Sequence, residues 1–306
     1  NSRRRSETSD HPPSNAPDHL MFENLDLMIP PIVAGLVILS IHAYLGLHVL
    51  GRGVIFVDLA FAQIAALGTT VGLLVGFEVG SAMSLAFALG FTLFGALIFS
   101  FTRMEKSIVP QEAIIGTSYV VASAAVILLA GLSAEGAEHV SETLTGSLIW
   151  IDWPAIIKIA VVYAVIGGIH YGLRRRFLAV TFAPEKAGNI RLWDFLFYVT
   201  FGVVIAFSVE VAGVLMVFSA LVIPAVIAFL YTNQFGRALL IAWFAGTIAV
   251  VGGIGTSFYM DLPTGPLLVC FFGLVLVVAA ALRPILGMRA EGEIVVRALM
   301  DESSDS

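Results

Sequence analysis

The chain has 306 residues, of which 58% are hydrophobic and only 12% are charged, and its mean hydropathy is +0.96. Because about a quarter of the residues in a soluble domain are charged, this composition excludes an ordinary water-soluble fold. The net charge of −6 lies mostly in the terminal segments and short connections, so it gives no information about a charged partner. We expect no nucleic acid to bind.

The first segment of the chain, residues 1–27, is polar and rich in proline and contains a basic cluster from Arg3 to Arg5. Such a segment has too little apolar surface to fold, so we predict a disordered tail over 1–27. The apolar remainder predicts a membrane domain over 28–285. A polar tail over 286–306 is expected to follow it on the cytoplasmic side.

Long apolar runs fill the rest of the chain. A helix needs roughly 20 apolar residues to cross about 30 Å of hydrocarbon. Runs of that length, bounded by glycine, proline or charged residues, predict nine membrane-spanning helices at 29–50, 54–76, 80–101, 111–133, 154–173, 192–209, 211–232, 237–259 and 263–283. We therefore expect an all-α, polytopic helix bundle.

The short connections between these runs alternate in charge. Basic connections contain Arg52, Arg103, the arginines at 174–176, Arg237 and Arg283, and the connections that alternate with them contain acidic residues, among them Glu78, Glu210 and Asp261. Lysine and arginine accumulate on the cytoplasmic side of a membrane. The pattern therefore predicts a multi-pass plasma-membrane protein with its amino terminus outside and its carboxyl terminus in the cytoplasm.

An ionisable residue inside a span is costly, and Asp58 is the clearest case. The residues that share its face of the second predicted helix are all small: Ala62, Ala65, Thr69, Gly72 and Gly76. Such a face permits another helix to approach closely, and a carboxylate at its end can bind a divalent cation near a narrow passage. In the alternative interpretation, Asp58 only pairs near Arg52 at the membrane interface.

Two further oxygen ligands are candidates for the same pathway. Gln63 lies on a neighbouring face of the second helix and offers a carbonyl oxygen. Glu112 follows Pro110 at the start of the fourth helix. A carboxylate there can serve the pathway or simply offset the helix dipole.

The histidines give weaker indications. His42 and His48 are six residues apart, about 240° around a helix, so they cannot hold one metal from one face. We retain His42 as a candidate for lining the pathway. Glu138 and His139 lie in an acidic outer connection, which either attracts cations before entry or is an ordinary solvated loop.

Several kinds of site are missing from the sequence. It contains no GxxxxGK[ST] motif and no polar block large enough for a nucleotide-binding domain, so any ATP must be hydrolysed by another chain, and we expect no enzyme here. A single cysteine, Cys270, excludes an intrachain disulfide and a thiolate cluster. The basic connection 173–191 is a candidate contact for an ATPase, although it is equally consistent with an orientation signal alone.

Five stretches, in order, resemble landmarks of the zinc/manganese/iron permease family of ABC importers, and the resemblance covers about 29–284. They are GRGVIFVDLAFAQIAALG (51–68), EAIIGTSYV (112–120), TFAPEKAG (181–188), VAGVLMVFSALVIPAVIA (211–228) and YMDLPTGP (259–266). The resemblance implies a permease subunit that forms the pathway for a divalent metal ion as a dimer. It also implies cytoplasmic ATPase subunits, an extracytoplasmic metal-binding protein and no permanently bound cofactor.

The stretch at 181–188 is similar to the family's cytoplasmic segment that contacts the ATPase. The resemblance, together with the basic charge of this connection, assigns ATPase coupling to six residues: Arg174, Arg175, Arg176, Phe182, Pro184 and Glu185. Ala183 departs from the family, which usually has an aspartate at that place.

A second departure bears on the metal. The family commonly has Ser-His-Ala after the aspartate of the second span, where this chain has Phe61, Ala62 and Gln63. Imidazole favours zinc, whereas carboxylate and carbonyl oxygens favour harder ions such as manganese. Zinc and manganese both stay open at this point. The alternative from another class is a secondary ion carrier or channel that uses no ATP, with Asp58 as its coupling carboxylate.

Overall fold

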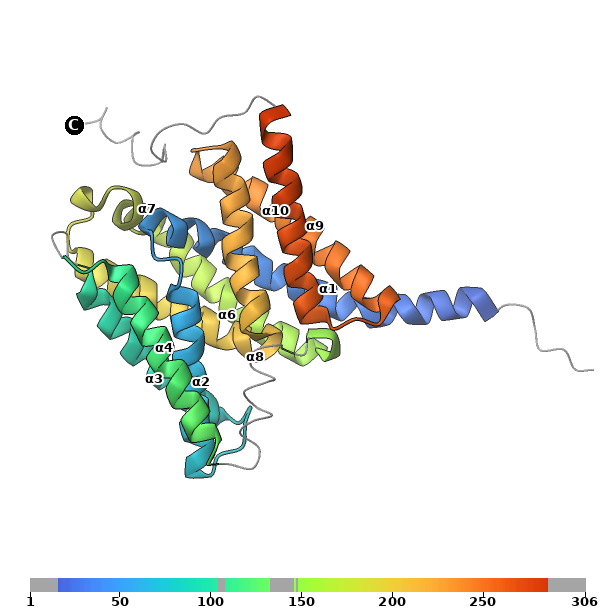
Figure 1. The fold of residues 1–306 in the computed structure, drawn as a ribbon, viewed down its shortest axis with the longest axis horizontal. Coiled ribbons are helices and arrows are strands. Elements are labelled where there is room, and N and C mark those ends of the chain that lie inside the picture. The colour runs from blue at the N-terminus through green and yellow to red at the C-terminus, as the bar shows by residue number, and fades with distance from the viewer. Residues whose placement is uncertain (1–15, 104–107, 133–145, 147, 286–306) are drawn as a thin grey trace, which may run out of the picture.

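The computed structural model describes residues 16–103, 108–132, 146 and 148–285 (Figure 1). Its long helices are α1 (Ala16–Arg52), α2 (Val57–Val75), α3 (Ala82–Thr102), α4 (Gln111–Ala130), α6 (Trp153–Gly172), α8 (Ile190–Tyr231), α9 (Phe235–Met260) and α10 (Thr264–Ile285). Shorter elements are η1 (Leu148–Trp150), α7 (Arg174–Phe182) and η2 (Pro184–Lys186). The described residues form no β-strand, and the predicted all-α bundle is confirmed.

Eight helices in the described part of the chain are long and apolar enough to cross a membrane. One of them, α8, has 42 residues and contains a non-helical residue, Gly213, at φ 74° and ψ 161°. Positive φ is strained for residues with a Cβ, so glycine is the residue that permits a break here. Figure 1 shows the two parts of α8 running in different directions. They correspond to the two predicted spans 192–209 and 211–232, and the other seven predicted spans correspond to one helix each.

The amino-terminal end of α1 differs from the prediction. The helix begins at Ala16, inside the segment 1–27 that its composition predicted to be disordered. Pro17 is tolerated at a helix start because its missing N–H would have no helical partner there. Residues 18–29 contain no glycine or proline, so nothing interrupts the helix before the apolar part. The predicted tails over 1–15 and 286–306 lie outside the described residues.

The helices pack as two groups against α8. One group consists of α2, α3 and α4, and the other of α1, α9 and α10 (Figure 1). Residues on all sides of α8 are buried, as expected for an apolar helix at the centre of a bundle. Helix α2, which carries Asp58, therefore lies among α3, α4 and α8.

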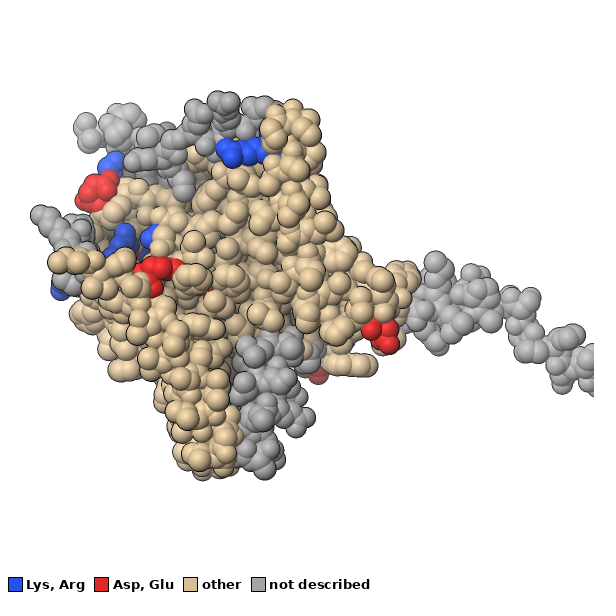
Figure 2. Space-filling view, viewed as in Figure 1, with Lys and Arg blue, Asp and Glu red and all other residues tan. Residues whose placement is uncertain are grey.

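The predicted basic connections meet at one end of the bundle. Hydrogen bonds join Arg52 at the end of α1 and Arg103 after α3 to α7 and to the start of α8. Few charged side chains appear over the visible helical body in Figure 2. The Lys and Arg that it shows lie toward the side where α7 and the end of α10 lie in Figure 1. The connections with Arg52, Arg103 and the arginines at 174–176 thus lie at one end of the bundle, where Figure 2 also shows acidic side chains.

Close helix contacts are made through glycine, although on α2 the closest one is at Gly68, next to the predicted small face, whose own Gly72 makes only an ordinary contact at 3.5 Å. A Cβ on Gly68 would lie 2.6 Å from the carbonyl oxygen of Phe87 and 2.8 Å from the Cα of Ala88, both in α3. A Cβ on Gly46 in α1 would lie 2.0 Å from the carbonyl oxygen of Leu221 in α8. Because these obstacles are backbone atoms, a larger residue requires the helices to separate.

We expect Gly68→Ala to destabilise the protein by about 1–3 kcal/mol, because the new methyl group meets the α3 backbone. Thermal unfolding of the detergent-purified chain measures this change. Gly116→Ala in α4 is the matched control, because a Cβ there meets nothing within 4 Å. The control should be neutral or stabilising by up to about 1 kcal/mol. Equal melting temperatures for the two variants would contradict the close α2–α3 contact.

Candidate functional site

The start of α2 is held by a carboxylate from another helix. Phe56, the residue before α2, supplies no side-chain cap of its own. Its backbone N–H instead donates to Oε1 of Glu112 over 2.9 Å. The free N–H groups at a helix start require such acceptors. The sequence left two roles open for Glu112, in the pathway or at the start of its own helix, and the structure shows that Glu112 binds the start of α2.

Asp58 is the second residue of α2, and only 1% of its surface is exposed. Within the described part of the chain, neither oxygen of its carboxylate has a hydrogen-bond partner, and neither does Oε2 of Glu112. A buried carboxylate without a partner is costly. The structure thus places unpartnered carboxylate oxygens at one helix start. Carboxylate oxygens are ligands that hard and borderline divalent cations prefer.

The alternative interpretation of Asp58 does not agree with the structure. In that interpretation Asp58 reaches to, or pairs at, the interface near Arg52, but its side chain is buried without a partner among the described residues, and Arg52 binds Asp194 over 2.7 Å. The described residues contain no group of three or more His, Cys, Asp or Glu side chains that could hold a metal ion. A cation at the start of α2 would therefore need ligands beyond these two carboxylates.

The other two candidates for the pathway lie apart from this pair. Gln63 is buried on α2 five residues after Asp58, about 140° further around the helix. His42 is buried on α1, where its Nδ1 donates to the carbonyl oxygen of Ile38 over 2.7 Å and its ring lies edge-on to Tyr163 of α6. The structure thus places His42 between α1 and α6, whereas Asp58 lies at the start of α2, which Glu112 of α4 binds.

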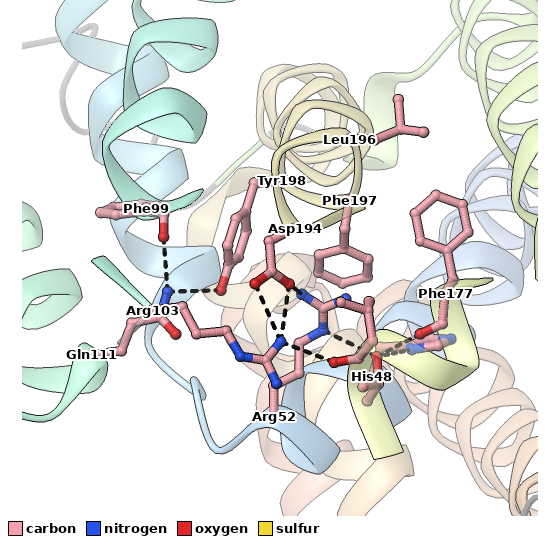
Figure 3. Close-up of polar contacts among 12 residues, drawn as sticks. His48, Arg52, Phe99, Arg103, Gln111, Phe177, Asp194, Leu196, Phe197 and Tyr198 are labelled. Carbon is pink, nitrogen blue, oxygen red and sulfur yellow. Dashed lines mark hydrogen bonds and ion pairs between the residues drawn. The ribbon is translucent and has the colours of Figure 1, made fainter. Parts of the chain in front are cut away.

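A polar network lies at the end of the bundle where the basic connections meet (Figure 3). Its centre is Asp194, a fully buried residue near the start of α8. Oδ1 of Asp194 accepts from Nη1 of Arg52 over 2.7 Å and from Nη1 of Arg103 over 3.0 Å. The side chain of Arg52 is 2% exposed, and its guanidinium lies 3.7 Å from the ring centroid of Phe197. One carboxylate thus compensates two guanidinium groups.

The same two arginines bind α7. Nε of Arg52 donates to Oγ1 of Thr181 over 3.1 Å, and Nη1 of Arg103 donates to the carbonyl oxygen of Val180 over 2.9 Å. Backbone carbonyls in the last turn of a helix have no helical partner, and a cation there also interacts favourably with the helix dipole. Asp194 therefore holds two arginines that in turn hold two consecutive residues of α7.

His48 adds a second link between α1 and α7. Its Nδ1 lies 2.7 Å from Oγ1 of Thr181, while the Thr181 hydroxyl donates to the carbonyl oxygen of Phe177 over 2.9 Å. Because the Thr181 proton is committed to Phe177, Nδ1 of His48 is the donor. The hydroxyl oxygen of Thr181 thus accepts hydrogen bonds from two residues of α1, His48 and Arg52.

Gln111 connects this network to the start of α4. Its Nε2 donates to the carbonyl oxygen of Phe99 in α3 over 2.9 Å and to the hydroxyl of Tyr198 over 3.1 Å (Figure 3). Tyr198 lies one turn after Asp194 on α8. Gln111 is followed directly by Glu112, which holds the start of α2. The network and the Asp58 carboxylate are therefore joined through neighbouring residues.

The predicted ATPase-coupling residues lie in α7 and η2. The arginines at 174–176 are exposed at the start of α7, and Glu185 is exposed in η2, where Pro184 is half-buried. Phe182 at the end of α7 faces inward, with its ring centroid 6.0 Å from that of His48. The predicted contact surface thus consists of charged groups on the outside and an aromatic anchor within.

Sequence reasoning missed the central residue of the network. Asp194 falls inside the predicted span 192–209, so the cost of an ionisable group in a membrane was a signal that could have identified it. Arg52 and Arg103 served only as indicators of orientation, although they bind Asp194. Glu138 and His139, the predicted entry residues, lie outside the described residues.

Comparison with known proteins agrees with this architecture. Residues 24–283 match the model of the ABC 3 transport family. The chain belongs to the ABC 3 transport family. This finding confirms the predicted family resemblance.

Several curated membrane proteins are similar to this chain, which spans only 46% of the length of one of them and 62% of another. The chelated iron transport system membrane protein YfeC of Yersinia pestis is 27% identical over 184 residues, which are 59% of this chain and 62% of that protein. A probable metal transport system membrane protein of Chlamydia pneumoniae is 25% identical, and the match covers 43% of this chain and 46% of that protein. The high-affinity zinc uptake system membrane protein ZnuB of Haemophilus influenzae is 24% identical, with 80% of this chain and 92% of that protein covered.

Two solved structures share the fold. PsaBC from Streptococcus pneumoniae in complex with Fab superposes with a TM-score of 0.70 at 17% identity, covering 85% of this chain and 95% of the matched chain. An inward-facing conformation of a metal-chelate type ABC transporter superposes with a TM-score of 0.61 at 17% identity, covering 86% and 99%. At this identity, the likeness establishes the arrangement of the helices.

The two buried aspartates should respond in opposite ways to loss of charge. Asp194→Asn leaves Arg52 and Arg103 without a counterion, and we expect it to destabilise the protein by about 3–5 kcal/mol. Asp58→Asn removes a buried charge that has no partner, and we expect it to stabilise the protein by about 1 kcal/mol or more. Thermal unfolding in detergent measures both. A lower melting temperature for Asp58→Asn would show that this carboxylate has a stabilising partner.

Proposed function

We propose that this chain forms the membrane pathway of an ATP-driven importer for divalent transition-metal ions. One observation carries the proposal: Asp58 is a buried carboxylate whose oxygens have no partner in the described part of the chain, and the helix start that carries it is bound by Glu112, whose second oxygen is also without a partner. Such a residue is retained in a membrane protein when it serves transport, because it costs stability otherwise. The family membership and the relatives named for iron and zinc support a metal as the cargo.

The energy source in this proposal is a separate ATPase, since the sequence contains no nucleotide-binding motif. Its contact surface comprises α7 and η2, with the exposed arginines at 174–176 and Glu185. We place this end of the bundle in the cytoplasm because the basic connections gather there. The opposite end then faces the outside of the plasma membrane and receives the metal from an extracytoplasmic binding protein, with Glu138 and His139 near the entrance.

Alternating access explains why Asp58 is closed off from the surface. At 1% exposure it cannot exchange ions with solvent in the conformation described. A pathway that opens first outward and then inward passes through such closed states, and ATP-driven movement of α7 would select between them. A second copy of the chain is expected to complete the pathway, because Asp58 and Glu112 alone supply too few ligands for a divalent cation.

The ligand types favour manganese over zinc. Asp58, Glu112 and Gln63 offer oxygen, and His42 lies with α6 rather than at the start of α2. Oxygen ligands suit harder ions, whereas imidazole favours zinc. Relatives carry names for iron, manganese and zinc transport, so the family alone does not select among these metals.

Asp58→Asn should lower metal uptake by at least about tenfold, the effect of 1.4 kcal/mol, because it removes a charged ligand from the pathway. The measurement is uptake of Mn²⁺, Zn²⁺ or Fe²⁺, each alone, into proteoliposomes that contain the chain, its ATPase and its binding protein. Asp261→Asn is the matched control: Asp261 is an exposed aspartate at the end of α9 with φ 51°, a conformation that asparagine tolerates. Normal uptake by the Asp58 variant would remove Asp58 from the pathway.

The same preparation distinguishes the importer from a carrier or channel. An importer requires ATP and an ATPase that co-purifies with this chain in detergent. If the chain alone conducts metal ions across liposomes without ATP, the importer proposal is wrong and the carrier alternative is correct. Asp58→Asn should abolish transport in either case, so ATP dependence is the deciding measurement.

Gln63→His tests the basis of metal choice. An imidazole on α2 adds a ligand that zinc prefers, so the ratio of zinc uptake to manganese uptake should rise. Competition between the two ions in the proteoliposome assay measures this ratio. Gln63→Asn is the control, since it keeps an amide and shortens the side chain. An unchanged ratio in the histidine variant would place position 63 away from the metal.

A further inference from the structure

The two arginines on either side of Asp194 bind α7 at consecutive residues. Arg52 comes from the end of α1 and holds the side chain of Thr181, whereas Arg103 follows α3 and holds the backbone of Val180. Without the carboxylate of Asp194 the two guanidinium groups would repel each other, and the arginines could not keep these positions. Asp194 fixes both, over 2.7 and 3.0 Å, from the buried start of α8.

This arrangement has little freedom to adjust. Asp194 is fully buried, the side chain of Arg52 is 2% exposed, and the Arg52 guanidinium is stacked on Phe197. Polar groups in such surroundings cannot exchange a protein partner for water. A displacement of α7 must therefore either break these hydrogen bonds or move the ends of α1 and α3 with it.

A continuous series of contacts leads from this point to the start of α2. Tyr198 lies one turn after Asp194 on α8, and its hydroxyl accepts from Gln111 over 3.1 Å. The next residue, Glu112, accepts from the backbone N–H of Phe56 over 2.9 Å. Phe56 lies two residues before Asp58. Each step is a hydrogen bond or a short piece of helix.

We propose that Asp194 is a positioning residue for transport, which fixes Arg52 and Arg103 so that movement of α7 reaches the carboxylates at the start of α2. The proposal rests on the proposed function, in which an ATPase displaces α7. It assigns to Asp194 a role in coupling, distinct from metal binding and from ATPase docking. Both carboxylate oxygens of Asp194 accept hydrogen bonds from arginines, so neither is free for a metal, and its burial keeps it away from a docked ATPase.

The test compares two carboxylates of α8 in the complete transporter. Asp194→Asn removes the central carboxylate of the network. Glu210→Gln is the matched control, because Glu210 forms an exposed ion pair with Lys158 over 3.6 Å near the break in α8. Each complex, reconstituted with its ATPase and binding protein, is assayed for co-purification of the ATPase, basal ATP hydrolysis and metal transported per ATP hydrolysed. Mn²⁺, Zn²⁺ and Fe²⁺ are supplied separately.

We expect Asp194→Asn to retain the ATPase and basal hydrolysis while the metal transported per ATP falls about tenfold. Glu210→Gln should match the wild type in all three measurements. A purely structural role for Asp194 would instead lower assembly, hydrolysis and transport together, in proportion to the folded protein recovered. That result, or an unchanged transport ratio, would overturn the proposal.

Thr181→Val provides a second variant in case Asp194→Asn does not fold. It keeps the shape of the side chain and both ion pairs of Asp194, but it removes the hydroxyl through which Arg52 and His48 bind α7. The transport ratio should again fall, with the ATPase still bound. An unchanged ratio in this variant also overturns the proposal.

Failure of the proposed function would look different. If the wild-type chain binds no ATPase or transports no metal with ATP, the importer proposal fails before any variant is compared. If the wild type transports metal with ATP and both network variants keep its transport ratio, the importer stands and only the coupling role of Asp194 is wrong.

Discussion

The ion pairs of Asp194 with Arg52 and Arg103 are the constraint on which the rest of this structure depends. They lie where the ends of α1 and α3, the segment α7 and the start of α8 meet. In surroundings of low polarity an uncompensated charge is far more costly than in water, so these three side chains can hardly separate. That requirement fixes where four parts of the chain, distant in sequence, stand relative to one another.

Asp58, unlike Asp194, has no ion pair among the described residues to compensate its charge. Both aspartates are buried, yet Asp194 has two cationic partners while Asp58 has no partner among the described residues. The contrast separates a carboxylate that organises the fold from one that the fold tolerates at a cost. In a membrane protein, a tolerated charge of this kind is the expected property of a site that an ion visits and leaves.

Glycine determines how the helix groups approach each other. The contact of Gly68 with the α3 backbone holds α2 close to α3, and Gly213 divides α8 into two parts. Lipid supplies no hydrophobic force between helices, so close packing through small residues has to hold the bundle together. Glu112 of α4 accepts a hydrogen bond from the backbone N–H of Phe56 and so holds the start of α2, which carries Asp58.

The sequence by itself determined the all-α membrane fold, the spans to within a few residues and the resemblance to a metal-transport family, because apolar length and connection charge are local properties. It also identified Asp58 and the small face of α2 from helical periodicity. Only the tertiary structure decided which partner each charged residue has. Arg52 binds a residue 142 positions away, and Glu112 serves a helix other than its own. Such pairings depend on how helices pack, and neither composition nor periodicity contains that information.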